Sequence, residues 1–141
     1  MSTLKVTNVA HETSTLNTLV FDNGGGSGNG RVTTKGTIGE ISAVSYASTI
    51  TLDFRTANNF STTLTGNVTF ANPSNISAGQ SGVLFITQDG TGSSTAAFGS
   101  YWDFSDGTAP TLSTGANQVD VIAWIARTNT NIAAQFIGNF S

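Results

Sequence analysis

The stretch that decides the fold runs from Asn72 to Phe104 and reads NPSNISAGQSGVLFITQDGTGSSTAAFGSYWDF. At its centre lies Val83-Leu84-Phe85-Ile86, an unbroken apolar run that is too short for a helix. Gly79 and Gly82 precede this run, and Asp89-Gly90-Thr91-Gly92 follows it. The pattern predicts a strand that is buried on both faces and is entered and left through glycine turns.

The second half of the stretch predicts a hairpin followed by an aromatic loop. Thr95 to Phe98 comes directly after the glycine turn, so we expect it to pair with the central strand. Tyr101, Trp102 and Asp103 then form a candidate patch, in which the rings would stack on a glycan or contact a protein partner. The simpler alternative is that these rings close one end of the core.

Elsewhere in the chain the hydrophobic period is two, which is typical of strands with one buried face. Apolar side chains fall on even positions from Val44 to Phe54 and again from Phe60 to Phe70, with a hairpin turn expected at Gly66-Asn67. Val119 to Arg127 is apolar on both phases and predicts a central strand, and Ile132 to Phe140 alternates as a final strand. The fold class predicted is all-β, an antiparallel β-sandwich of jelly-roll-like form.

A glycine-rich joint, Gly24 to Gly30 (GGGSGNG), separates an N-terminal arm from this domain. We therefore expect an anchoring arm over 1–23, a joint over 24–30 and a sandwich domain over 31–141, which would fold without the arm. The arm carries short strand-like pieces that would bind a partner by lending their backbone to a sheet edge, and these are Leu4, Val6, Leu19, Val20 and Phe21.

Charge and composition exclude several classes of protein. Only 9% of the 141 residues are charged and the net charge is −3, so the chain is a poor match for nucleic acid. There is no cysteine for a disulfide or a thiolate metal site, and no apolar run approaches the length of a membrane span. We expect no nucleic-acid partner, no membrane partner and no metal or other cofactor.

The residues with catalytic potential are few. His11 is the single histidine and lies in the arm, so a Ser-His-Asp arrangement is not expected. Asp103 and Asp106 flank the aromatic loop and are the one candidate carboxylate pair for glycosidase chemistry or for calcium, although Asp-Gly is first of all a turn sequence. The sequence therefore indicates a protein that is not an enzyme.

The distal part of the chain, roughly Arg55 to Ser141, resembles a module that ends the tail fibres of tailed bacteriophages, especially marine ones, and that also makes up small virion proteins. The residues that carry the resemblance are Leu64-Thr65-Gly66-Asn67, Asn72-Pro73-Ser74-Asn75, Ala78-Gly79-Gln80-Ser81-Gly82, Ile86-Thr87-Gln88-Asp89-Gly90-Thr91-Gly92, Gly107-Thr108-Ala109-Pro110-Thr111-Leu112, Val119-Asp120-Val121 and Asn139-Phe140-Ser141.

The resemblance implies a structural protein of the virion, assembled in the host cytoplasm. We expect a capsid decoration or cement protein whose partners are the major capsid protein or another virion protein. The alternative is a tail-fibre or other tail protein that binds a host glycan. The module also implies a homotrimer. This agrees with the expectation that a charge-poor sandwich with two-faced apolar strands, such as Val119 to Ile125, needs a partner surface.

Overall fold

The computed structural model describes residues 38–140. The anchoring arm, the glycine-rich joint and the five arm residues Leu4, Val6, Leu19, Val20 and Phe21 lie outside the described residues. The elements are β1 (Ile41–Ala43), β2 (Thr49–Ile50), β3 (Asn59–Leu64), β4 (Val68–Phe70), β5 (Ser81–Gln88), β6 (Ala96–Phe98), β7 (Trp102–Phe104), the short 3-10 turn η1 (Ser105–Gly107), β8 (Val119–Thr128) and β9 (Asn131–Phe140).

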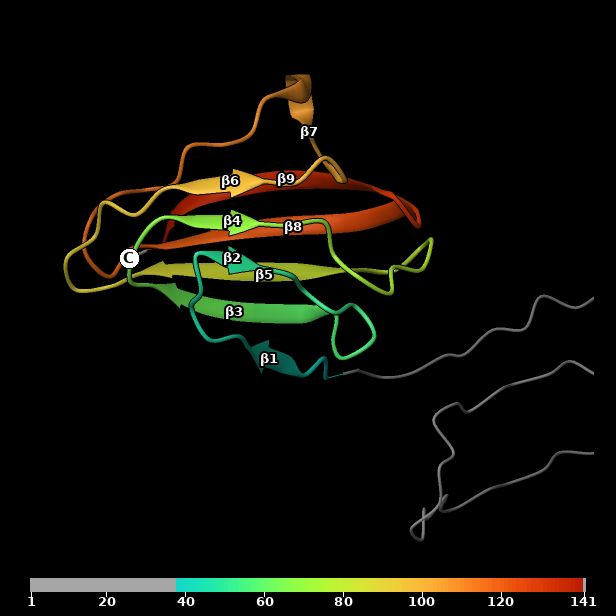
Figure 1. The fold of residues 1–141 in the computed structure, drawn as a ribbon, viewed down its shortest axis with the longest axis horizontal. Coiled ribbons are helices and arrows are strands. Elements are labelled where there is room, and N and C mark those ends of the chain that lie inside the picture. The colour runs from blue at the N-terminus through green and yellow to red at the C-terminus, as the bar shows by residue number, and fades with distance from the viewer. Residues whose placement is uncertain (1–37, 141) are drawn as a thin grey trace, which may run out of the picture. The chain divides into compact units, whose positions relative to one another are not determined.

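The strands form two packed layers, and the chain alternates between them (Figure 1). The larger layer is a six-stranded sheet in the order β1-β3-β5-β8-β9-β7, and the smaller layer is a three-stranded sheet in the order β2-β4-β6. From β1 to β6 the chain places each odd strand in the large sheet and each even strand in the small one. Successive strands of one layer are therefore parallel, because the chain returns to its starting side through the other layer.

The all-β sandwich predicted from the sequence is confirmed, but most of its strand pairs are parallel. Only β5, β8 and β9 keep the expected antiparallel pairing. β6 does not form a hairpin with β5, and β3 and β4 do not form a hairpin either, because in each case the second strand lies in the small sheet. A half-buried strand alternates with period two in either pairing, so this period does not reveal strand direction.

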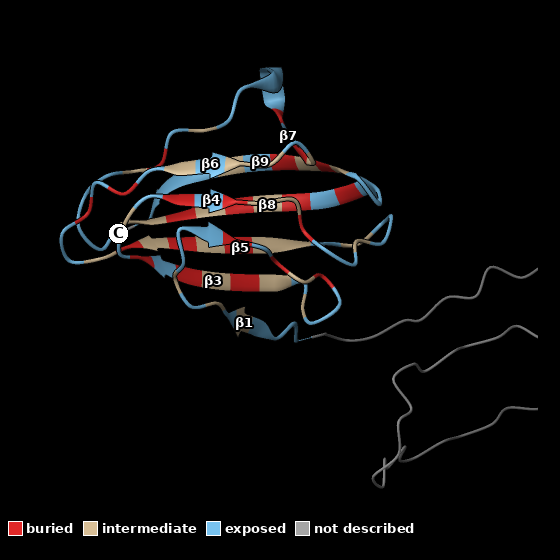
Figure 2. Cartoon of the chain, in the orientation of Figure 1, coloured by how far each residue is buried: buried red, intermediate tan, exposed pale blue. Residues whose placement is uncertain are grey.

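The core lies between the layers and is built from the inward-facing side of each strand (Figure 2). Phe60, Leu84 and Ile122 lie side by side on β3, β5 and β8 and are fully buried. Phe70 and Ile50 approach from the small sheet. Trp124 stacks on Phe54, which precedes β3, so aromatic rings fill one end of this core.

Two buried polar side chains hold the loops at the other end. Gln88 donates from Nε2 to the carbonyl oxygens of Ser94 and Ser113 at 2.8 and 2.9 Å, and its Oε1 accepts from the Ser94 N–H at 3.0 Å. Asp120 accepts from the N–H of Ser113 at 2.8 Å and from the N–H of Asn139 at 2.9 Å. Because buried polar groups are costly without partners, these bonds fix the loops relative to β5 and β8.

Candidate functional site

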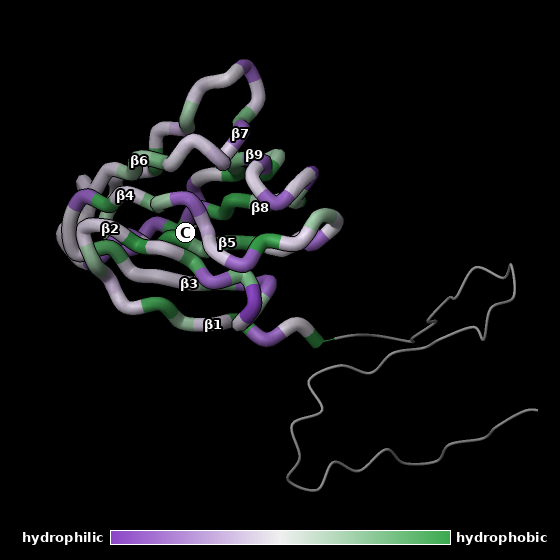
Figure 3. The backbone as a smooth tube through the Cα atoms, turned by 45° about the vertical axis from the view of Figure 1, so that its right-hand side comes forward, coloured by the Kyte–Doolittle hydropathy of each residue, from purple (hydrophilic) through white to green (hydrophobic). Residues whose placement is uncertain are grey.

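The outward face of the six-stranded sheet carries apolar side chains where a solvated sheet face would be polar. On β5 these side chains are Val83 and Phe85. On β8 they are Ala123, which pairs with Val83, and Val121, which pairs with Phe85. All four are half-buried rather than buried, so they line a surface of the protomer. Figure 3 shows that hydrophobic residues recur along the backbone of β5, β8 and β9.

The strand register arranges this outer face in rows that run across the sheet. One row joins Asn59, Val83, Ala123 and Gln135, with Ile41 at its β1 end. The next row joins Ala43, Ser61, Phe85, Val121 and Ile137, and a third joins Thr63, Thr87, Val119 and Phe140. A fourth, at the other end, joins Ser81, Ile125, Ala133 and Asp103. We call these four rows the outer face.

Large aliphatic side chains of the outer face are open to solvent. Ile41, Ile125 and Ile137 are 52%, 49% and 45% exposed. The opposite surface of the sandwich differs, since the outward positions of the small sheet are Thr49, Thr69 and Ala97. Small side chains, two of them threonines, lie on one side of the domain and exposed isoleucines lie on the other, so the two sides are suited to different environments.

The charged side chains on the outward positions of β7 and β8 lie at one corner. Asp103 on β7 forms an ion pair with Arg127 at the end of β8, with Oδ2 and Nη1 3.3 Å apart. Both side chains are about half exposed, and Asp103 also accepts a hydrogen bond from Asn131 Nδ2 at 3.2 Å. Because the two charges cancel and solvent screens them, the pair adds little stability and leaves the corner without net charge.

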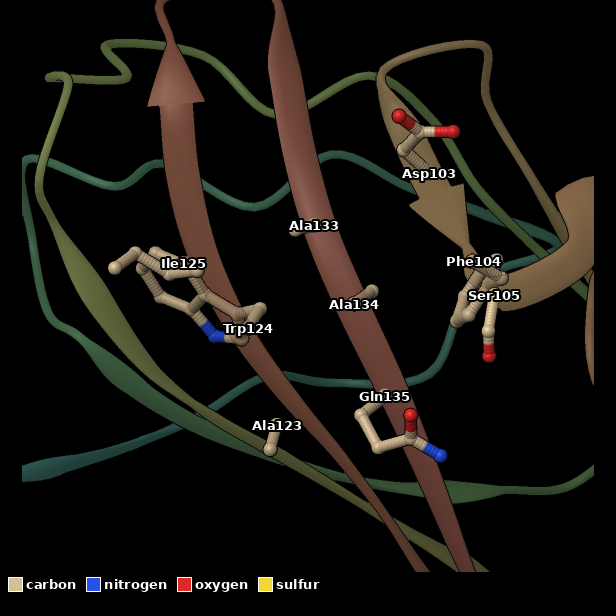
Figure 4. A pocket seen from close by; sticks show the side chains of 9 residues that line it. All are labelled: Asp103, Phe104, Ser105, Ala123, Trp124, Ile125, Ala133, Ala134 and Gln135. Atoms are coloured by element: carbon tan, nitrogen blue, oxygen red, sulfur yellow. The ribbon is translucent and has the colours of Figure 1, made fainter.

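A shallow groove of about 570 Å³ lies beside this corner (Figure 4). Its floor consists of small and apolar side chains on β8 and β9, and its wall, formed by β7 and the start of η1, carries a carboxylate and a hydroxyl. The lining residues are Asp103, Phe104, Ser105, Ala123, Trp124, Ile125, Ala133, Ala134 and Gln135. The alanines leave room above the sheet, so a large side chain of a partner would fit there.

The structure does not bring the three patch residues predicted from the sequence together on the surface. Trp102 is buried, and its indole Nε1 donates to the carbonyl oxygen of Ala71 at 3.2 Å. Tyr101 is half-buried and packs against the core. Asp103 alone is exposed, in the wall of the groove. The rings of Tyr101 and Trp102 therefore pack at one end of the core, which is the alternative to a binding patch that the sequence left open.

The other acidic candidates are scattered. Asp106 is exposed within η1, at a positive φ of 61°. Asp53 lies on the side of the domain where the loop after β2 meets Asn75, whose Nδ2 donates to Asp53 Oδ1 at 2.8 Å. This hydrogen bond, a second from the Arg55 N–H and the nearby Arg55 charge lower the pKa of Asp53 below its ordinary value. Across residues 38–140 no three acidic or histidine side chains gather as a metal site would require.

Sequence reasoning expected two-faced apolar strands such as Val119 to Ile125 to find a partner, but it did not locate the outer face, because it assigned Val83 to Ile86 to a strand buried on both sides. Phe85, expected to be buried, is half-buried and faces outward. The signal was present in Val119 to Arg127, where both the inward and the outward phases are apolar. Such a run indicates a second apolar surface, but it does not say whether that surface lies inside the protomer or between molecules.

None of the helical turns formed by the described residues is long and apolar enough to cross a membrane. Comparison with known proteins finds no matching family model, no matching curated protein and no matching solved structure.

Proposed function

We propose that the protein is a non-enzymatic structural component of a bacteriophage virion, which decorates or cements the capsid. The observation that carries this proposal is the outer face: a sheet surface with exposed isoleucines and no net charge is suited to binding protein. The phage context comes from the sequence resemblance described above. The protein would act by assembly, as a homotrimer held on the major capsid protein or on another virion protein.

In this proposal the N-terminal arm attaches the protein to the particle. Residues 1–23 hold apolar pairs at strand spacing and few charges, which are Lys5, His11, Glu12 and Asp22. Such a segment binds by adding backbone hydrogen bonds to an exposed sheet edge of the platform, and several joined arms raise the effective concentration of each. Attachment of this kind depends weakly on salt.

Deletion of residues 1–23 tests the proposal. We expect the shortened protein to stay folded and soluble and to lose its binding to particles that lack the protein, while the full chain binds them and stays bound at about 0.5 M salt. Replacing 1–23 by a glycine-serine segment of equal length is the matched control for the loss of length. Equal binding by the full and the armless chains would place attachment on the sandwich and contradict the role of the arm.

The alternative function is a tail-fibre or tail-associated protein that binds a host glycan. The groove favours it, because Asp103, Ser105 and Gln135 offer polar groups beside an apolar floor. The described residues place no exposed aromatic ring in that groove, however, and stacking on a ring is a common way to hold a sugar. Shearing tails from particles separates the alternatives: a decoration protein remains with the heads, and a tail protein leaves with the tails.

A further inference from the structure

We infer that the outer face of the six-stranded sheet is where copies of this chain pack against one another. The inference rests on the proposed function, since it names the partner of the surface that carries it. A neighbouring copy would cover the half-buried side chains of β5 and β8, together with the exposed Ile125 further along β8 and Ile137 on β9. The partner is a second copy of this chain rather than the capsid.

Charge is the first argument for a second copy. A surface that meets a copy of itself brings like charges together unless it is neutral, because both partners carry the same groups. The outward positions of β1, β3, β5 and β9 in the described residues hold no charged side chain, and β7 and β8 contribute Asp103 and Arg127, which are paired at one corner. The outer face therefore packs against a copy without repulsion.

Size is the second argument. Two rows of five strands and two of four cover a patch roughly 27 Å long and 19–24 Å wide, or about 600 Å², from the usual spacings of strands and of alternate residues. A stable interface buries about 800 Å² of accessible surface on each partner. The projected area of the outer face is of that order before the relief of its side chains is counted, so it is large enough to hold protomers together.

The arrangement of residues within the patch is the third argument. Apolar side chains lie in the middle on β5 and β8, and the neighbouring β3 carries the uncharged polar side chains Asn59, Ser61 and Thr63. Apolar side chains mixed with uncharged polar ones, with charges depleted, are usual at the centre of interfaces between subunits. The alanine-floored groove at the β7 edge gives this patch a hollow, and the exposed isoleucines give it projections, as interdigitating copies require (Figure 4).

The test is the mass of the purified full chain in solution, with variants of exposed residues that leave the core intact. We expect light scattering at micromolar concentration to give three times the 14.5 kDa of one chain. Ile125→Asp and Ile137→Asp should each give a folded monomer, because they place a charge in the interface without touching the core. Ile125→Val and, on the opposite surface, Thr69→Asp should keep the assembled mass.

A second measurement does not depend on the aspartate variants folding well. The chain has no cysteine, so a single cysteine can be introduced and its reaction with a maleimide followed. Ala123→Cys on the outer face should react at least tenfold more slowly than Ala97→Cys, which lies on the exposed surface of the small sheet. Dilution to dissociate the assembly should remove most of that difference.

The outcomes separate this inference from the proposed function. A dimer that the aspartate variants dissociate supports the outer face as a self-interface and contradicts the trimer. A wild-type monomer, or a folded Ile125→Asp variant of unchanged mass, overturns the inference. If a wild-type monomer nevertheless binds particles and Ile125→Asp abolishes that binding, the outer face binds the capsid protein or another virion protein. The proposed function then stands without this inference.

Discussion

The ring of Phe54 stacks on the indole of Trp124, with ring centroids 4.1 Å apart and planes 20° apart. Phe54 follows β2 of the small sheet and Trp124 lies on β8 of the large one, so this contact joins the two layers at one end of the core. Phe54 also stacks on Phe60, with centroids 5.8 Å apart. Three aromatic rings thus connect the layers, and Trp124 is far from the other two in sequence.

Replacement of Phe54 by alanine should be among the most destabilising single changes. Phe54 is 2% exposed, so the variant loses the transfer free energy of the ring and leaves a cavity between the layers. We expect the free energy of unfolding to fall by about 3–5 kcal/mol, measured by denaturant unfolding. Thr69→Ala, at an exposed side chain on the outward side of the small sheet, is the control and should cost less than about 1 kcal/mol. Similar losses for both would contradict the assigned core.

Gln88→Glu tests the buried hydrogen bonds that hold the loops. The side-chain amide donates to two carbonyl oxygens, and a carboxylate of the same shape would face them as a second acceptor. We expect a loss of roughly 2–4 kcal/mol at pH 7. Burial raises the pKa of such a carboxyl, so the folded state takes up the proton more readily and the variant should recover stability as the pH falls towards 4. Asn129→Asp, in the exposed β8–β9 turn, should show neither effect.

Asp53 should titrate below its ordinary pKa of 3.8 because of the hydrogen bond from Asn75. Since its folded pKa is lowered, its contribution to stability is present above the unfolded pKa and is lost as the pH falls through the folded value. Asn75→Ala should raise the pKa of Asp53 towards 3.8, as followed by NMR of its carboxyl carbon. Asn129→Ala should leave that titration unchanged. An unshifted pKa after Asn75→Ala would show that the asparagine is not the main cause.

The domain described here should fold without the N-terminal arm. Its buried side chains all lie between Ile50 and Ala134, so a chain that begins at Gly30 keeps the whole core. We expect its melting to be cooperative, with a midpoint within a few degrees of that of the full chain. A chain that begins at Thr51 removes β1 and β2 and should melt far lower or aggregate. If the chain from Gly30 also aggregates, residues before it belong to the folded unit.

Several elements could be predicted from the sequence because their side-chain pattern is decisive. The apolar run at Val83 to Ile86 lies in β5, Val119 to Arg127 lies in β8, and Ile132 to Phe140 lies in β9, with residues 129–130 between the last two. In each case β-branched or aromatic residues stand between turn residues, and local sequence suffices to mark a strand. The two-layer class follows from the number of such strands.

Which strands pair with each other could not be predicted. Glycine and asparagine mark a change of chain direction, but they do not determine in which layer the next strand lies. Gly66-Asn67 and Asp89 to Gly92 carry hairpin chemistry, yet each connects strands in different layers. The outer face was hidden for a related reason. An apolar residue such as Val121 has the same pattern whether it meets another strand of its own chain or another molecule, so alternation alone cannot tell a core from an interface.

Phe85→Ala tests whether one side chain lies in the core of the protomer or in an interface between molecules. Phe85 is half-buried on the outer face, so within a single protomer its removal should cost only about 1–2 kcal/mol, less than a fully buried phenylalanine. In the assembled protein the ring would also be covered by a neighbouring copy, and the same change should cost more. We therefore expect Phe85→Ala to lower the free energy of unfolding more in the unaltered chain than in the monomeric Ile125→Asp background.

Phe54→Ala is the control for this cycle, because its ring lies inside the protomer and should cost the same in both backgrounds. Denaturant unfolding at several protein concentrations measures both differences, since the midpoint of an assembly shifts with concentration and that of a monomer does not. Equal costs for Phe85→Ala in the two backgrounds would mean that no neighbouring copy covers the ring. A cost of about 3–5 kcal/mol in the monomer would instead mean that Phe85 belongs to the core of the protomer.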